Sequence, residues 1–175
     1  MSDLAKQYQR KTDKEHVLDN PDTYIGAVER VDSDLWIVTN SDNNEKIELK
    51  TIEYVPGLYK LFDEGIVNCR DHVVRMIQLE SPNKKLVSQI EVEIDKVSGK
   101  ITLRNDGNGI DVAKHPTEDL WIPEMIFGHL RTSTNYDKTQ KKIVGGKNGF
   151  GFKLVLIWST WGCVETVDHI RGLKY

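Results

Sequence analysis

GGKNGFGFK, residues 145–153, holds four glycines in nine positions and runs straight into the apolar segment LVLIWSTW. Glycine costs backbone entropy on folding, so such a cluster marks a place where something approaches the backbone closely. A glycine-rich turn that opens a helix also offers free N–H groups to an anion. Taken alone, the stretch is equally consistent with a surface loop before a core helix.

Two common phosphate-binding motifs do not fit this stretch. A Walker A loop requires Lys directly after its second glycine, but Phe152 follows Gly151. The dinucleotide fingerprint G-x-G-x-x-G fits Gly149 and Gly151 and then meets Leu154. The stretch therefore predicts only that an anion binds at a helix N-terminus, without a specific nucleotide motif.

The composition is that of a soluble globular protein with one sizeable core: 175 residues, 38% hydrophobic and 29% charged, with net charge −3. This charge does not favour nucleic-acid binding by the chain as a whole. The apolar runs are too short to span a membrane, and the polar N-terminus is no secretory signal. We therefore expect no membrane partner. Cys69 and Cys163 have no metal-ligand spacing, and we expect a reduced, intracellular setting.

Periodicity and turn signals predict an α+β fold, with helices on one face of a mixed, mostly antiparallel sheet. A capping box, Thr12 to Glu15, starts a short helix that ends before Pro21. Residues 131–148 form a long polar loop, which in compact domains is usually functional or disordered. The other expected helices are 57–79, 123–130 and 150–161, and the expected strands are 35–38, 46–55, 90–94, 101–103 and 163–167.

The long helix 57–79 carries Glu64, Asn68 and Asp71 on the side opposite its apolar residues. A solvated polar face is the ordinary explanation. Against it, Gly65 costs about 1 kcal/mol relative to alanine inside a helix, and Asn68 is a poor helix former. A carboxylate one turn from a carboxamide can activate water and hold a hard cation, so this pair is a candidate catalytic site.

RNDGNGI, residues 104–110, follows the expected strand 101–103. Asp-Gly and Asn-Gly are common turn pairs, so a plain turn is one explanation. The other is that Asp106 accepts a hydrogen bond from an exocyclic amine. Gly107 and Gly109 would then let a flat ring lie against the backbone.

In chain order, these features resemble the GHKL ATPases, which share the Bergerat nucleotide-binding fold. Four longer stretches are similar to the N-terminal ATPase domain of eukaryote-type DNA topoisomerase II, and together the resemblance covers nearly the whole chain. It implies a two-layer α+β sandwich, with residues 1–26 as an N-terminal arm and short helix and 27–175 as a C-terminally incomplete ATPase domain. The stretches are KQYQRKTDKEHVLDNPDTYIGAVE, EYVPGLYKLFDEGIVNCRDH, PEMIFGHLRTSTNYD and KKIVGGKNGFGFKL.

The resemblance implies roles for individual residues. Glu64 matches the general base that activates the water attacking the γ-phosphate of ATP, Asn68 the Mg²⁺ ligand, and Asp106 the adenine-reading acid. Lys153 faces phosphate charge, and Tyr24 reaches the nucleotide of the partner subunit. The full implied ATP-binding set is Asn68, Asp71, Asn105, Asp106, Gly107, Gly109, Ile110, Ser133, Thr134, Asn135, Gly146, Lys147, Asn148, Gly149, Phe150, Gly151 and Lys153.

Five residues, at four places in the chain, depart from the family's pattern without removing a catalytic group. Asp19-Asn20 stands where a basic pair is usual, and Gly65 where an aliphatic residue is usual. Phe152 replaces a small residue, and His72 replaces an Asn near the phosphates. These departures indicate a divergent member of the family, for which a viral source is one hypothesis.

The implied function is the ATP-binding and ATP-hydrolysing N-terminal gate of a type II topoisomerase, a homodimer that closes on ATP around double-stranded DNA to drive strand passage. It would act in the nucleus, or in a virus factory or virion. The transducer and DNA-cleavage regions lie outside these residues, so we expect a fragment of low activity. A free-standing GHKL switch that dimerises on ATP without cleaving DNA is the alternative. Lysines 138, 141, 142 and 147 are interpreted as part of a solvated lid rather than a DNA-binding patch.

Overall fold

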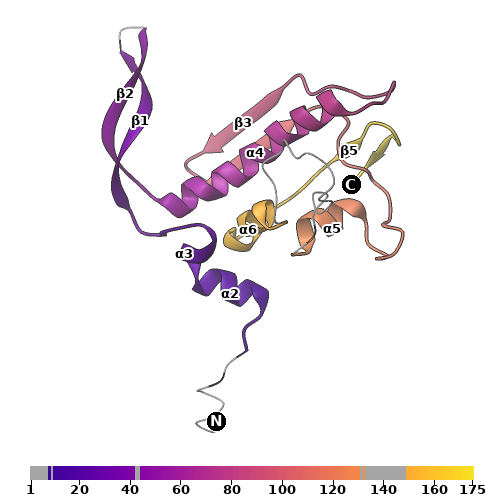
Figure 1. Cartoon of the computed structure of the whole chain (residues 1–175), viewed down its shortest axis with the longest axis horizontal. Helices are drawn as coiled ribbons and strands as arrows, with labels where there is room; N and C mark the ends of the chain where they lie inside the picture. The colour runs from indigo at the N-terminus through magenta and orange to yellow at the C-terminus, as the bar shows by residue number, and fades with distance from the viewer. Residues whose placement is uncertain (1–7, 9, 42–43, 131, 133–148) are drawn as a thin grey trace. The chain divides into compact units, whose positions relative to one another are not determined.

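The computed structural model describes residues 8, 10–41, 44–130, 132 and 149–175. The chain divides into two compact units, Met1–Leu61 and Phe62–Tyr175. Helices and strands occur in both, which confirms the predicted α+β class (Figure 1). The described strands form three separate two-stranded antiparallel sheets, so the expected single mixed sheet is not formed by the described residues.

In the first unit, the predicted capping box starts helix α2 (Asp13–Asp19). The Glu15 N–H donates to Thr12 Oγ1 at 3.2 Å, and the Thr12 N–H donates to Glu15 Oε2 at 2.8 Å. Two otherwise unpaired N–H groups are thereby satisfied. Pro21 does end this helix, but it also opens α3 (Pro21–Tyr24), a single turn that the sequence analysis did not anticipate.

A long hairpin completes this unit. Strands β1 (Val31–Ser41) and β2 (Asn44–Tyr54) pair antiparallel over 11 residues each. The first strand is longer than the expected 35–38 because polar residues continue the ladder past the apolar run. One example is the cross-strand pair of Asp34 and Thr51, whose side chains hydrogen-bond at 2.6 Å.

Helix α4 (Pro56–Gln78) begins in the first unit and supplies the main helix of the second. It runs along the antiparallel pair β3 (Ile90–Asp95) and β4 (Lys100–Asn105), which match the predicted strands (Figure 1). The pair turns at Gly99, whose φ of 69° favours glycine. Cys69 and Met76 of α4 are buried, as the apolar periodicity predicts.

Two short helices and a short strand pair complete the second unit: α5 (Ile122–Gly128), α6 (Gly151–Trp158), β5 (Val167–Asp168) and β6 (Leu173–Lys174). Except for Thr132, the predicted loop 131–148 lies outside the described residues. None of the helices in the described ranges has an apolar stretch of the length that crossing a bilayer requires.

Two predicted elements are shorter in the structure. The helix expected to reach residue 161 ends at Trp158, because Ser159 has extended backbone with φ −96° and ψ 143°. Its hydroxyl donates to the Val155 carbonyl at 2.6 Å, which satisfies one carbonyl of the last turn. The strand expected at 163–167 is reduced to β5, because β6 offers few residues to pair with it.

Candidate active site

The carboxylate of Glu64 lies against the first residue of α6. A Cβ built on Gly151 would be 2.5 Å from Glu64 Oε2 and 3.5 Å from its Cδ. No side chain other than hydrogen fits at position 151 unless the carboxylate moves. The Glu64 carboxylate, on α4, therefore contacts the glycine turn at the N-terminal end of α6. Negative charge is favoured at that end of a helix.

Asn68, one turn after Glu64, is exposed. Its Nδ2 donates to the backbone carbonyl of Glu64 at 2.5 Å, which leaves Oδ1 as the acceptor of the amide. An amide oxygen beside a carboxylate suits a hard cation such as Mg²⁺.

Asp71 does not share this exposure, since only 7% of its surface is accessible. The ordinary explanation, a solvated polar face, therefore does not hold at this position. Asp71 lies two helical turns after Glu64, on the same side of α4, and Glu64 is itself half-buried. Other parts of the unit therefore cover this side of the helix at Asp71 and partly at Glu64, while Asn68 remains exposed.

The Asp106 carboxylate holds the segment that leads into β3. Its Oδ1 accepts hydrogen bonds from the N–H of Ser88 at 2.7 Å and of Gln89 at 3.0 Å, and its Oδ2 accepts from Ser88 Oγ at 2.6 Å. These hydrogen bonds lower the pKa of Asp106 to about 2, and the bond from the Ser88 hydroxyl has the largest effect. The group is therefore ionised at neutral pH. An incoming amine must share its acceptor sites with Ser88 and Gln89.

The glycines of the NDGNGI turn are required by the chain's own packing. Gly107 and Gly109 have φ of 109° and 73°. A Cβ on Gly107 would meet Val87 Cγ2 at 2.7 Å and His72 Nε2 at 3.0 Å, and a Cβ on Gly109 would overlap the carbonyl oxygen of Val167. A flat ring therefore has to approach this turn from the side away from these neighbours.

His72 lies against Gly107 with 7% of its surface accessible. Burial lowers the pKa of its imidazole, although the nearby Asp106 acts in the opposite direction. Among the described residues, Nε2 of this ring has no hydrogen-bond partner. No periodicity in the sequence indicates this position next to the turn.

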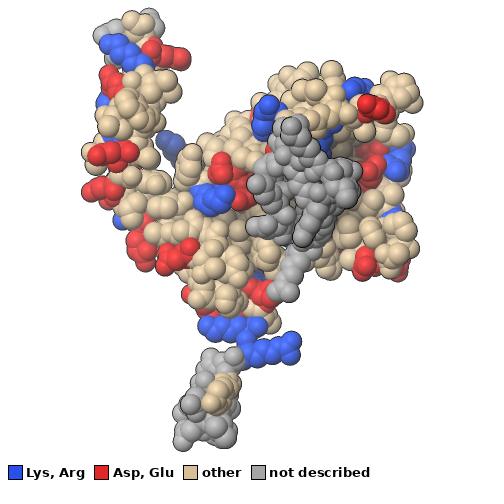
Figure 2. All heavy atoms as spheres, in the orientation of Figure 1, with Lys and Arg blue, Asp and Glu red and all other residues tan. Residues whose placement is uncertain are grey.

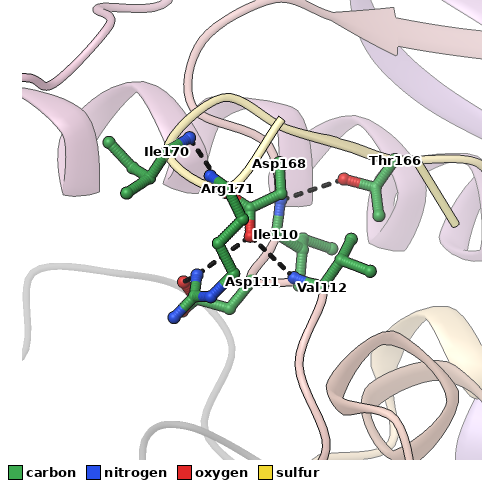
Figure 3. A network of polar contacts seen from close by, with 7 residues as sticks. All are labelled: Ile110, Asp111, Val112, Thr166, Asp168, Ile170 and Arg171. Atoms are coloured by element: carbon green, nitrogen blue, oxygen red, sulfur yellow. Dashed lines mark hydrogen bonds and ion pairs between the residues drawn. The ribbon is translucent and has the colours of Figure 1, made fainter. Parts of the chain in front are cut away.

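The C-terminal strand pair holds the end of the same turn (Figure 3). Thr166 Oγ1 accepts a hydrogen bond from the Ile110 N–H at 2.9 Å. Asp168, only 2% exposed, accepts from the Val112 N–H and from Arg171 Nη1, each at 2.9 Å. Arg171 also pairs with Asp111. Sequence reasoning missed these residues, since they lie more than 50 positions beyond the turn they hold.

Lys153 is buried, with 5% of its surface accessible, and its ammonium donates three hydrogen bonds. They reach Thr132 O at 2.7 Å, Thr132 Oγ1 at 2.8 Å and Gly149 O at 2.6 Å. Burial lowers the pKa of Lys153 to about 8. All three acceptors are neutral, so the charge has no carboxylate partner among the described residues. Because all three donors are in use, contact with a phosphate requires one of them to be released.

The remaining predicted site residues are placed only in part. The Tyr24 hydroxyl hydrogen-bonds His16 Nδ1 of the same chain at 2.9 Å. Asn105 Nδ2 donates to the backbone carbonyl of Asp106 at 2.8 Å, and Phe150 precedes α6 as its N-cap residue. Ser133, Thr134, Asn135, Gly146, Lys147 and Asn148, together with the other lid lysines, lie outside the described residues.

Basic and acidic side chains are interspersed on the face shown in Figure 2. Both signs appear there, and the described part of this face does not gather its lysines and arginines into one broad patch. A DNA-binding protein normally carries such a patch.

No family model matches the sequence. Proteins named DNA topoisomerase 2 are nevertheless similar to nearly all of it. The protein of that name from Acanthamoeba polyphaga mimivirus is 47% identical over 174 residues, which cover 98% of this chain and 13% of that protein. The one from Penicillium chrysogenum is 42% identical over 174 residues, or 99% of this chain and 10% of that protein. The chain thus spans about a tenth of the length of these curated relatives.

Two solved structures are similar in fold as well as in sequence. The ATPase region of Saccharomyces cerevisiae topoisomerase II matches with a TM-score of 0.85 at 43% identity, covering 98% of this chain and 43% of that one. The ATPase and transducer domains of DNA topoisomerase II from Balamuthia mandrillaris match with a TM-score of 0.81 at 42% identity, covering 97% of this chain and 40% of that one.

Proposed function

This chain is a homologue of the ATPase region of DNA topoisomerase 2, and we propose that it is the ATP-binding and ATP-hydrolysing N-terminal gate of a type II DNA topoisomerase. The observation that carries the proposal is the contact between Glu64 and Gly151. It brings a carboxylate to the N-terminal end of a helix that opens on a glycine-rich turn, where a triphosphate has N–H groups to bind.

Glu64 acts as the base that takes a proton from the water attacking the γ-phosphate. Asn68 Oδ1 would be the ligand that this chain supplies to Mg²⁺. No group of three or more His, Cys, Asp or Glu side chains that could hold a metal occurs in the described residues, which suits a Mg²⁺ that takes most of its ligands from the nucleotide. When bound, Mg²⁺ neutralises charge on the phosphate oxygens.

The adenine lies beside Asp106, with Asn105, Gly107, Gly109 and Ile110 around it, and the described part of the glycine turn, residues 149–153, lies at the phosphates. The proposal also covers the fold of the domain. Residues 27–175 are part of a two-layer GHKL sandwich whose sheet is larger than the described strand pairs, and residues 1–26 are an arm. The TM-scores of 0.85 and 0.81 support this arrangement.

In the complete protein, two copies close on ATP around double-stranded DNA, Tyr24 reaches the nucleotide of the other subunit, and hydrolysis resets the gate for strand passage. The protein acts where DNA is replicated, in the nucleus or in a virus factory. The 47% identity to a mimivirus protein supports the viral hypothesis. The much greater length of the relatives favours the topoisomerase over a free-standing nucleotide switch.

Calorimetry with a non-hydrolysable ATP analogue and Mg²⁺ tests the proposal on the complete protein. Asp106→Ala should lose affinity by roughly 10- to 100-fold, because a hydrogen bond to a charged group contributes about 1.5–3 kcal/mol. Asp106→Asn should keep most of the affinity, since its Oδ1 still accepts hydrogen bonds from Ser88, Gln89 or an amine.

Asp95→Ala is the matched control. Asp95 also holds a turn through bonds from Val97 and Ser98, but it lies at the far end of the β3–β4 hairpin. This variant should bind the analogue normally. Undiminished affinity in Asp106→Ala would mean that NDGNGI is only a turn, and no binding by the unaltered protein would refute the function itself.

A further inference from the structure

We propose that Phe152 is a positioning residue, whose ring packs over Gly65 and thereby keeps the Glu64 carboxylate in place against Gly151. The inference rests on the proposed function, because that function assigns Glu64 the role of base. Phe152 acts through the packing of two helices rather than by contact with the nucleotide.

Two neighbouring residues of α4 meet two neighbouring residues of α6. A Cβ built on Gly65 would lie 3.8 Å from Phe152 Cε2, an ordinary van der Waals distance, so the ring edge lies over this glycine. Glu64 precedes Gly65 on α4, and its Oε2 lies against Gly151, which precedes Phe152 on α6. The ring contact and the carboxylate contact are therefore consecutive on both helices, and a shift in one moves the other.

The ring is held from a second side by α5. The rings of Phe127 and Phe152 have centroids 5.5 Å apart and planes at 81°, an edge-to-face arrangement favoured by aromatic pairs. On β4, Leu103 Cδ1 fills more of the space that a side chain at position 65 would need. Leu103 and Phe152 thus account for a glycine in the interior of a long helix, where it is otherwise unfavourable.

Removing the ring leaves a space between α4 and α6 that the two helices can relax into. The Glu64 carboxylate then loses its fixed position relative to the glycine turn. Catalysis depends steeply on such placement, while nucleotide binding depends on Asp106 and the phosphate-binding turn. The expected signature is a fall in kcat with little change in KM or in affinity.

The test compares Phe152→Ala, Phe152→Leu and Leu156→Ala in the complete protein that contains this chain. Leu156 lies on the same helix, with Cδ2 directed at Gly162 rather than at Glu64. We expect Phe152→Ala to lower the kcat for ATP about tenfold or more, since a misplacement of about 1 Å can cost about 100-fold. KM and analogue affinity should stay within about twofold. Phe152→Leu should restore most of kcat, and Leu156→Ala should lower the thermal midpoint while keeping kcat.

An unchanged kcat in Phe152→Ala overturns the inference. An equal loss of kcat in Leu156→Ala also overturns it, because general destabilisation then explains the effect. If Phe152→Ala does not fold, Phe152→Val, whose side chain is smaller than that of Leu, decides: a folded variant with reduced kcat and normal KM supports the inference, and wild-type kcat opposes it. Glu64→Gln separates the two proposals. If Glu64→Gln abolishes ATP turnover but Phe152→Ala retains it, only the positioning role of Phe152 is refuted. If the unaltered protein does not turn over ATP, the proposed function itself is refuted.

Discussion

Lys153 carries a charge into the interior of the second unit, where its described partners are the neutral oxygens of Thr132 and Gly149. Burial of an ammonium without a carboxylate disfavours the charged form, which is why its pKa falls to about 8. A phosphate that reached this group would supply an anionic partner that the described residues do not. If Lys153 contacts the nucleotide as proposed, its protonation is coupled to nucleotide binding.

We therefore predict that affinity for a non-hydrolysable ATP analogue decreases as the pH rises above about 8. Below this value, Lys153 is charged in both the free and the bound protein, so affinity is constant. Above it, the bound state keeps a proton that the free state has lost, because the phosphate raises the pKa, and binding weakens. Calorimetry between about pH 7.5 and 9.5 measures this, and Lys153→Met should bind more weakly with no such slope. The same slope in Lys153→Met would assign the titration to another group.

At the scale of elements, the sequence predicted what local signals encode. Three features follow from residues that are close together in the sequence: the capping box of α2, the apolar side of α4 and the β3–β4 hairpin. Long-range packing was not predictable in this way. Periodicity gives no sign that Thr166 and Asp168 bind the backbone of residues 110–112, or that Asp71 is buried. It does place Glu64 and Asn68 one turn apart, but not Gly151 beside them.

The docking of β5 on the NDGNGI turn gives a prediction at this scale. Gly109→Ala should destabilise the second unit by at least about 2 kcal/mol, because strain at positive φ adds to overlap with the Val167 carbonyl. Gly99→Ala is the matched control: its φ is 69°, but no other atom lies within 4 Å of an added Cβ. It should lose only about 1–2 kcal/mol from the backbone conformation. Urea unfolding measures both, and equal losses would show that β5 does not restrict this position.

At the level of the whole molecule, the feature to consider is how far the apolar side chains of the β3–β4 pair are covered. Val92 is 45% exposed and Ile94 55%, and within the described residues neither strand has a second neighbour. The solved yeast ATPase region is more than twice as long as this chain, which covers 43% of it. The apolar side chains of this pair are therefore left partly exposed by the described residues.

Residues 1–175 purified alone should accordingly bind ATP weakly and hydrolyse it hardly at all. Apolar surface left uncovered weakens the packing that positions α4 and α6. Steady-state ATP turnover of this fragment, measured beside the complete protein, tests the expectation. Equal turnover by the two would show that the described residues already contain everything that catalysis requires.

The Glu64 carboxylate, held against Gly151, is the group that we propose as the base for ATP hydrolysis. Its most direct test is the kcat for ATP of the complete protein carrying Glu64→Gln, with Glu80→Gln, an exposed residue just beyond α4, as the control. We expect Glu64→Gln to bind the non-hydrolysable analogue but to lose roughly 10²–10⁴-fold in kcat, while Glu80→Gln turns over normally. Near-normal turnover in Glu64→Gln would contradict it.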